Sequence, residues 1–272
     1  MPELPEVEVI RRDLVPNVEG RRIVRAKLAE RRLTRRCGTP RAVEAALGGR
    51  SVVRLRRRGK FFLFDLDGDS LVVRLGMTGQ LLWWESEETY HPDRHTHACL
   101  VFAGGGILSY RDIRKFGEMF ILPTGAVERE LALGVEPLSR AFTTQALREI
   151  CRASTRIKPL LLNQTKIAGI GNIYADEALF RAGIRPMRRA ASLRAAEVQR
   201  LRDAVRVVLR AGIRHRGSTI ANFRDAGGEP GRYTSRHRVY HRHGQPCLAC
   251  GTPVRRIILG QRGTHFCPNC QR

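Results

Sequence analysis

Two Cys-X-X-Cys pairs near the C-terminus constrain the fold of this 272-residue chain more than any other feature. Cys247 and Cys250 form the first pair, Cys267 and Cys270 form the second, and sixteen residues separate the pairs. This spacing is typical of a site in which four thiolates surround one tetrahedral zinc ion. Such a site has no open coordination position, so the zinc that it predicts is structural. The alternatives are four unrelated thiols or a redox pair.

The chain between the two pairs predicts a β-hairpin. Residues 254–259 and 264–266 are apolar or β-branched runs, and the glycines of 260–263 suit a turn between them. Arg262 is expected at the tip of this hairpin. We expect the remaining three thiols to be small buried side chains: Cys37, Cys99 and Cys151.

The charge of the chain indicates a polyanionic partner. Lys and Arg number 49 against 26 Asp and Glu, which gives a formal net charge of +23. Only five of the bases are lysines, and the guanidinium fork of arginine suits phosphate oxygens. From Ala211 to the end there are eleven arginines and two acids. The alternative to nucleic-acid binding is a solvated basic face in an arginine-rich proteome.

The pattern of apolar residues predicts an α+β protein. A helix is expected over 6–19, and short apolar runs between glycine-rich turns then indicate a β-sandwich or barrel. The strands are expected at 51–57, 60–66, 70–75, 80–84, 98–102, 107–110 and 116–122. Helices are expected at 144–151, 159–164, 172–182 and 193–215, followed by a glycine-rich loop from 217. We therefore predict domains at 1–134, 135–235 and 236–272.

The segment from Leu160 to Asn172 joins two of these helices through glycine-containing turns. Asn172 suits the N-cap of the second helix, and exposed amides at a helix start bind phosphate. Gly169 and Gly171 would allow a nucleic-acid strand to approach, and Lys158 would add a charged contact. Plain packing of a helix hairpin is the alternative.

The N-terminal residues offer a nucleophile. Pro2 becomes the first residue if Met1 is removed, and it then carries a secondary amine with a reference pKa of about 8. The positive end of a following helix favours the neutral amine, which attacks a sugar C1′ to form an iminium ion. Glu3 would move protons beside it. The alternative is an ordinary terminus with an acid at a helix start.

Four further residues suit an enzyme that flips a nucleotide out of a duplex. Lys60 begins an expected strand within a basic run, and on sequence alone it is one more phosphate ligand. Met77 lies on a turn, while Arg114 and Phe116 share one face if their segment is extended. These last three side chains would fill the gap left by an extruded nucleotide, and ordinary core packing is their alternative.

Together these motifs resemble the formamidopyrimidine-DNA glycosylase family nearly from end to end. The resemblance lies in Met-Pro-Glu-Leu-Pro-Glu-Val-Glu at the N-terminus, Leu-Gly-Met-Thr-Gly at 75–79, and Gly-Ile-Gly-Asn-Ile-Tyr-Ala at 169–175. It is carried further by the segments 59–61, 114–117, 231–240 and 260–271.

The resemblance implies a base-excision repair enzyme that removes oxidised purines, namely 8-oxoguanine and formamidopyrimidines, and then cuts the strand. Its fold would be an N-terminal β-sandwich with flanking helices, a helix–two-turn–helix bundle and a β-hairpin zinc finger. Its partner would be double-stranded DNA with a damaged base, and one structural zinc its only cofactor. A loop at about 217–235 would cover the damaged base. We expect a monomer. We place it in the cytoplasm, because the sequence shows neither a secretory signal nor a long apolar run.

The resemblance also assigns a role to each matched residue. Pro2 would be the nucleophile, Glu3 its acid–base partner, Lys60 the proton donor in β-elimination, and Arg262 the residue assisting δ-elimination. The other matched residues would contact DNA: Lys158 and Asn172 on phosphates, His95 on the backbone, and Met77, Arg114 and Phe116 in the void.

The sequence departs from the family pattern at 233–238 and at 85–94, and the second segment is expected to be a surface loop. Because of the first departure, the sequence specifies the preferred damaged base less closely than it specifies the reaction. A sister glycosylase for oxidised pyrimidines is one alternative, although Leu4 and the 217–240 loop favour the purine enzyme. A non-catalytic DNA-binding protein on this scaffold is another, but it leaves Pro2, Glu3 and Lys60 unexplained. A zinc-finger regulator explains neither the N-terminus nor the β-domain.

Overall fold

The computed structural model describes residues 2–272 and divides the chain into two compact units. The N-terminal unit contains the chain through Ala132 together with His215–Arg232. The C-terminal unit contains Leu133–Arg214 and Tyr233–Arg272. The segment 215–232 therefore packs with the N-terminal unit, although the chain reaches it only after the longest helix.

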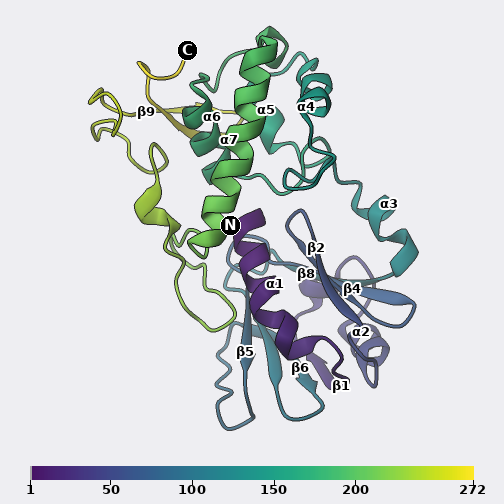
Figure 1. Cartoon of the computed structure of the whole chain (residues 1–272). Coiled ribbons are helices and arrows are strands. Elements are labelled where there is room, and N and C mark those ends of the chain that lie inside the picture. The colour runs from purple at the N-terminus through teal and green to yellow at the C-terminus, as the bar shows by residue number, and fades with distance from the viewer. Residues whose placement is uncertain (1) are drawn as a thin grey trace. The chain divides into compact units, whose positions relative to one another are not determined.

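The N-terminal unit is built on two antiparallel sheets (Figure 1). One sheet has the order β1-β6-β7-β5 and the other β2-β3-β4-β8. The strands are β1 Ile23–Leu28, β2 Arg54–Arg58, β3 Phe61–Asp65, β4 Asp69–Arg74, β5 Gln80–Trp84, β6 Thr96–Phe102, β7 Ile107–Arg111 and β8 Glu118–Pro123. Its helices are α1 Leu4–Val18, α2 Pro40–Leu47 and α3 Val127–Leu131.

The alternation of side chains along β3 explains why this strand is apolar throughout. Phe62 and Phe64 belong to the main core, which also takes residues from α1 and from the other sheet. Leu63 points to the opposite face and packs in a second cluster with Phe120 and Val127. Because successive side chains of a strand face opposite ways, β3 must be apolar on both sides.

The C-terminal unit contains four helices and a zinc-finger hairpin. The helices are α4 Thr144–Cys151, α5 Ile157–Leu162, α6 Asn172–Ala182 and α7 Ala195–Arg214, and the hairpin strands are β9 Arg255–Leu259 and β10 Arg262–Phe266. The long helix α7 lies against α6. Gly212 permits this close approach, since a Cβ there would lie 2.5 Å from the ring of Tyr174.

The expected α+β architecture is confirmed, with several differences in detail. Strand β1 and helices α2 and α3 were not predicted, and α5 begins at Ile157 rather than at Pro159. Thiol burial was overestimated: Cys151 is buried, whereas Cys37 and Cys99 are only half-buried. Among residues 2–272, no helix combines the length and the apolar character that a membrane crossing requires.

Candidate functional site

The N-terminus of α1 is held in one position by a capping box. Glu3 is the N-cap, its carboxylate accepts from the backbone of Glu6, and the Glu6 carboxylate accepts from the backbone amide of Glu3 at 2.9 Å. Both glutamates are almost fully buried, and Pro2 is buried beside them. Glu6 also accepts from the backbone amide of Ser218 at 2.8 Å. Pro2 and Glu3 thus stand at the positive end of a well-anchored helix.

Lys60 lies in the turn between β2 and β3, and α1 runs antiparallel to β2. Near the end of the helix, Glu19 accepts from the amide of Leu55 at 2.7 Å. Near its start, Glu8 forms an ion pair of 3.2 Å with Arg57. The N-terminal end of α1 therefore lies toward the C-terminal end of β2, where the turn to β3 begins. The turn that carries Lys60 consequently lies at the same end of the unit as Pro2 and Glu3.

Several arginines hold Glu8 in its charged form. Burial raises the pKa of this carboxyl, but hydrogen bonds from Arg11 and Arg12 outweigh burial and hold the pKa at about 2. Glu8 therefore remains an anion that ties α1 to β2 at neutral pH.

The structure brings Met77, Arg114 and Phe116 together. The Arg114 guanidinium lies 4.6 Å from the ring centroid of Phe116 and donates to the Met77 sulfur at 3.0 Å. Met77 and Phe116 are 38% and 46% exposed, so neither is the core residue of the alternative interpretation. They border a pocket of about 250 Å³ that Arg35 and Arg74 also line. The three side chains are thus an exposed, partly apolar group edged by cations.

Asp112, which the sequence did not single out, joins the two turns that carry this group. Its fully buried carboxylate accepts from the backbone amides of Gly117 and Arg114 at 2.9 and 3.2 Å, and from the hydroxyl of Tyr110 at 3.0 Å. The same carboxylate accepts from the hydroxyl of Thr78. In the sequence Asp112 is one acid within the Asp-Ile-Arg-Lys-Phe run, and an acid in such a charged run is equally compatible with an exposed position.

His95 lies just before β6 and is tied to the same region. Its carbonyl accepts from the amide of Asp112 at 2.9 Å, and its own amide donates to the Asp93 carboxylate at 2.9 Å. The half-exposed imidazole stays near the surface, where Arg94 donates to it at 3.2 Å. The backbone therefore fixes the position of His95 relative to the Asp112 turn.

The turns between α5 and α6 are closed by Gln164. Its amide group donates to the carbonyl of Ile170 at 2.9 Å, while its side-chain oxygen accepts from the amide of Gly169 at 2.9 Å. Gly169 has φ +85°, a conformation that favours glycine. The expected N-cap is wrong by one residue, because Gly171 is the N-cap and Asn172 begins the helix. The Asn172 amide instead donates to the carbonyl of Gly263 at 2.9 Å.

Lys158 lies in the interior of the C-terminal unit. Its ammonium is fully buried, 2.6 Å from the Asp176 carboxylate, and it donates to the Thr264 hydroxyl at 2.8 Å and the Gly263 carbonyl at 3.0 Å. The ammonium thus has one ion-pair partner and two hydrogen-bond acceptors, all within the C-terminal unit. The resemblance implied that Lys158 holds a backbone phosphate, whereas in the structure its side chain is fully buried.

The four cysteines of the two pairs fit one zinc ion. Their sulfur atoms all lie within 4.8 Å of one another, and Cys250 and Cys267 are 3.5 Å apart. A tetrahedron with Zn–S bonds of about 2.3 Å has sulfurs about 3.8 Å apart. The chain thus has one structural zinc site, and bound zinc would crosslink the hairpin to the preceding loop. Arg262 is exposed, but it pairs with Leu259 as the first residue of β10, so the tip is Gly260-Gln261 instead.

Glu177 is a second residue that sequence reasoning missed. Its buried carboxylate accepts from the backbone amides of Arg238, Val239 and Tyr240 at 2.9 to 3.0 Å. Burial raises the pKa of this carboxyl, although the three amides act in the opposite direction. Glu177 thereby anchors to α6 the segment that leads into the zinc finger.

The fold and the site define the class of bifunctional DNA glycosylases, which remove a base and then cleave the strand. Models of formamidopyrimidine-DNA glycosylase match the chain over residues 1–119 for the N-terminal domain and 133–224 for the H2TH domain. A model of the zinc finger found in FPG and IleRS matches residues 244–272. The chain belongs to the formamidopyrimidine-DNA glycosylase family, and it is a base-excision repair glycosylase and abasic-site lyase.

Individual relatives cover the whole chain. The formamidopyrimidine-DNA glycosylase of Geobacillus kaustophilus is 42% identical over 276 residues, with 100% of both chains covered. The crystal structure of the MutM (Fpg) protein of Thermus thermophilus has a TM-score of 0.88 at 43% identity and covers 99% of this chain and 98% of that one. A Lactococcus lactis FPG mutant in complex with a Fapy-dG containing DNA has a TM-score of 0.92 at 33% identity, with 100% of both chains covered.

Proposed function

We propose that this enzyme excises oxidised purines, 8-oxoguanine and formamidopyrimidines, from double-stranded DNA, with Pro2 as its nucleophile once Met1 has been removed. The observation that carries the proposal is the antiparallel run of α1 along β2. It brings the capped N-terminus and the Lys60 turn to one end of the N-terminal unit. In the proposed site, a secondary amine, a buried carboxyl and an ammonium would act together on a sugar C1′.

The proposed chemistry proceeds from base excision through opening of the sugar ring to two successive eliminations. The Pro2 nitrogen bonds to C1′ while the C1′–N bond breaks, and the departing base keeps the bonding pair and gains a proton. The amine then loses its proton as Glu3 protonates the opening O4′, which leaves an iminium ion. Loss of a C2′ proton expels the 3′ phosphate by β-elimination, assisted by Lys60. Loss of a further sugar proton expels the 5′ phosphate by δ-elimination, assisted by Arg262, and water releases the sugar remnant.

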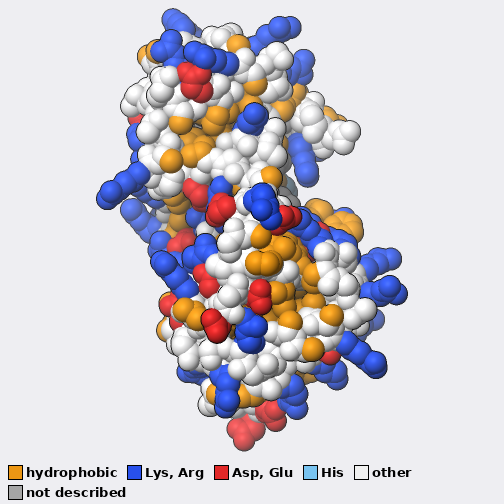
Figure 2. Space-filling view, turned by 90° about the vertical axis from the view of Figure 1, so that its right-hand side faces the viewer, with side chains coloured by type: hydrophobic (Ala, Val, Ile, Leu, Met, Phe, Trp, Pro, Cys, Tyr) orange, Lys and Arg blue, Asp and Glu red, His pale blue; other side chains and the backbone are white. Residues whose placement is uncertain are grey.

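Exposed residues on both units support DNA binding. We propose that Met77, Arg114 and Phe116 fill the space left by the flipped nucleotide, and that Asn172 and His95 contact the DNA backbone. Lys158 would act through the hairpin that it holds. Arginine and lysine side chains are spread over the face in Figure 2, and the formal net charge of the chain is +23. The loop at about 217–235 would cover the damaged base, and the enzyme would act as a monomer on nucleoid DNA in the cytoplasm.

Borohydride trapping tests this proposal. A labelled duplex with one 8-oxoguanine opposite cytosine is incubated with the enzyme, beside a duplex with an oxidised pyrimidine. A covalent band mainly with 8-oxoguanine is the expected result, and Pro2→Gly should weaken or abolish excision while duplex binding is largely kept. A band only with the pyrimidine lesion would show the sister specificity. Tight binding with no band on either duplex would show that the chain does not react through an amine.

A further inference from the structure

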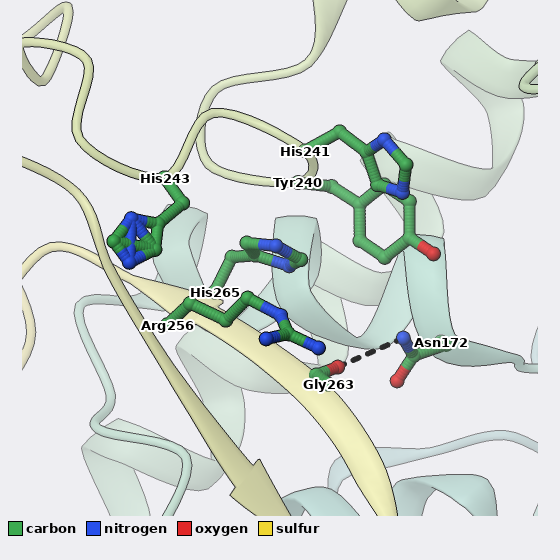
Figure 3. A pocket seen from close by; sticks show the side chains of 7 residues that line it. All are labelled: Asn172, Tyr240, His241, His243, Arg256, Gly263 and His265. Atoms are coloured by element: carbon green, nitrogen blue, oxygen red, sulfur yellow. Dashed lines mark hydrogen bonds between the residues drawn. The ribbon is translucent and has the colours of Figure 1, made fainter.

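One pocket of the C-terminal unit is lined by an unusual number of imidazoles. Its volume is about 490 Å³, and it lies between the zinc-finger hairpin and the loop before the finger (Figure 3). Its lining includes His241, His243, Arg256 and His265, with Asn172 and Gly263 at one side. We call this the histidine pocket. It lies wholly within one unit, so its shape does not depend on the placement of the other unit.

The hairpin register directs Arg256 into this pocket. Arg256 on β9 pairs with His265 on β10, so both side chains lie on one face of the hairpin. A Cβ at Gly263 would lie 3.3 Å from the Arg256 guanidinium, so the glycine leaves room for this side chain to extend across β10. Arg255, the preceding residue, is also exposed and points to the opposite face. The two arginine side chains therefore differ mainly in the face of the hairpin from which they project.

The loop before the finger supplies further polar side chains of the pocket, the imidazoles of His241 and His243. The ring of His241 stacks on Tyr240 with centroids 4.9 Å apart, and it lies 5.9 Å from the ring of His265. Glu177 fixes the backbone of this loop through the amide of Tyr240. His241 and His243 are exposed, whereas His265 forms the buried floor. The imidazoles are thus presented by a fixed loop to a space open to solvent.

None of the described residues that line the pocket is acidic. Among residues 2–272, no acidic side chain forms an ion pair with Arg256, His241 or His243. The nearby Asp176 is fully buried and already pairs with Lys158, with His265 Nδ1 3.4 Å away. Burial, followed by the charges of His265 and Arg256, lowers the pKa of His241. Arg256 therefore gives the pocket a positive charge without an acidic partner, and an anion would match it.

The arrangement of the imidazoles does not suit a metal ion. Among the described residues, only the four cysteines form a group of three or more His, Cys, Asp or Glu with ligand atoms close enough to share one ion. The imidazoles instead surround a space, and an N–H donor and a guanidinium are suited to a tetrahedral oxyanion. Phosphate is the oxyanion that a DNA-processing enzyme meets at high local concentration.

We propose that the histidine pocket binds a phosphate group, with Arg256 as its fixed cation and His241 and His243 as further donors. The inference rests on the proposed function, because DNA is the source of the phosphate. It extends the DNA contacts beyond Asn172, which lies at the side of the pocket, to residues that the family resemblance does not assign. The phosphate comes either from an internucleotide linkage of bound DNA or from the terminal monoester left by strand cleavage.

The test uses the zinc-loaded full chain and the matched pair Arg256→Gln and Arg255→Gln. Both variants lose one charge at neighbouring positions, but only Arg256 faces the pocket. Affinity for a duplex is measured at several salt concentrations. The slope of log K against log salt is negative, and each lost phosphate contact reduces its magnitude by about 0.9. We expect this reduction for Arg256→Gln, with the wild-type slope kept by Arg255→Gln. This result would identify the internucleotide phosphate as the source.

A second arm compares nicked product duplexes whose ends carry either phosphate or hydroxyl groups. A preference for phosphate ends that Arg256→Gln removes and Arg255→Gln retains would identify the terminal monoester. Equal behaviour of the two arginine variants in both arms would overturn the proposal. Borohydride trapping is run in parallel at saturating enzyme. If the wild type is trapped but Arg256→Gln and Arg255→Gln behave alike in both arms, only the phosphate pocket is refuted. If the wild type is not trapped at all, the proposed function is refuted.

Discussion

The Lys158 ammonium lies 2.6 Å from the Asp176 carboxylate, and neither side chain is exposed to solvent. Asp176 also accepts from the backbone amide of His265 at 2.8 Å. The pair therefore fastens β10 to helices α5 and α6, close to Arg262 and to the Gly263 carbonyl that Asn172 contacts. We infer that Lys158 is a positioning residue that acts through the hairpin.

Replacing Lys158 with Met should destabilise the chain strongly. The substitution leaves the Asp176 carboxylate buried without its partner, and removing one member of a buried pair costs about 3–5 kcal/mol. The double variant Lys158→Met with Asp176→Asn should recover part of this loss, because no buried charge remains. The exposed Lys166→Met is the matched control and should change the free energy of unfolding little. Urea denaturation measures all three.

The same variants distinguish a positioning role from direct phosphate binding. If Lys158 bound phosphate directly, its removal would reduce the salt dependence of duplex binding and leave the free energy of unfolding unchanged. Wild-type stability of Lys158→Met together with a lowered salt slope would therefore contradict the buried pair. Recovery of excision in the double variant would support positioning.

Replacing Asp112 with Asn should loosen the group of Met77, Arg114 and Phe116. The carboxylate accepts from two backbone amides and two hydroxyls, whereas an amide offers one acceptor and turns its NH₂ toward donors. We expect a loss of about 1–3 kcal/mol in the free energy of unfolding. Excision of 8-oxoguanine should fall more than binding of undamaged duplex. The exposed Asp67→Asn is the control, and equal excision by both variants would remove Asp112 from the site.

The sequence predicted helices and strands well where the spacing of apolar residues within one segment was clear. Residues 80–84, 144–151 and 172–182 form β5, α4 and α6 with the predicted bounds. Helix α2 was missed, because a short helix between arginine-rich turns gives little periodicity. Burial of Lys158 was not predictable, since a lysine is almost never buried without a partner, and its partner Asp176 lies on another helix. The association of 215–232 with the N-terminal unit likewise depends on long-range contacts such as that of Glu6 with Ser218.

Removing zinc should impair DNA binding before it impairs chemistry. Cys267→Ser takes one of four ligands from the site that holds the hairpin, while Pro2 and Glu3 belong to the other unit. We expect lower zinc content and weaker duplex binding, with residual trapping at saturating enzyme. Cys99→Ser, outside the cluster, should retain zinc and affinity. Metal analysis and fluorescence anisotropy provide the measurements, and normal binding by zinc-free Cys267→Ser would exclude the finger from DNA recognition.

His237 should make the C-terminal unit less stable in mild acid. The ring is almost fully buried and packs edge-on against Tyr233 and Tyr240, with centroids 5.5 and 5.6 Å apart. Burial, with a smaller contribution from His241, lowers the pKa of His237 from 6.5 to about 4. The unfolded chain therefore binds the proton more readily than the folded chain. The contribution of this residue to stability is complete above pH 6.5 and declines as the pH falls toward 4.

At pH 5 the loss from His237 alone is about 2 kcal/mol relative to pH 7.5. Other groups titrate over the same range, so the comparison is between the wild type and His237→Phe, both loaded with zinc, by urea denaturation at each pH. The variant should lose about 2 kcal/mol less than the wild type, because the titration of cysteines and carboxyls is common to both. His91→Phe, at an exposed position of the N-terminal unit, should follow the wild type. Parallel pH dependence in the wild type and His237→Phe would mean that the ring is protonated in the folded chain, with its charge accommodated between the two tyrosines.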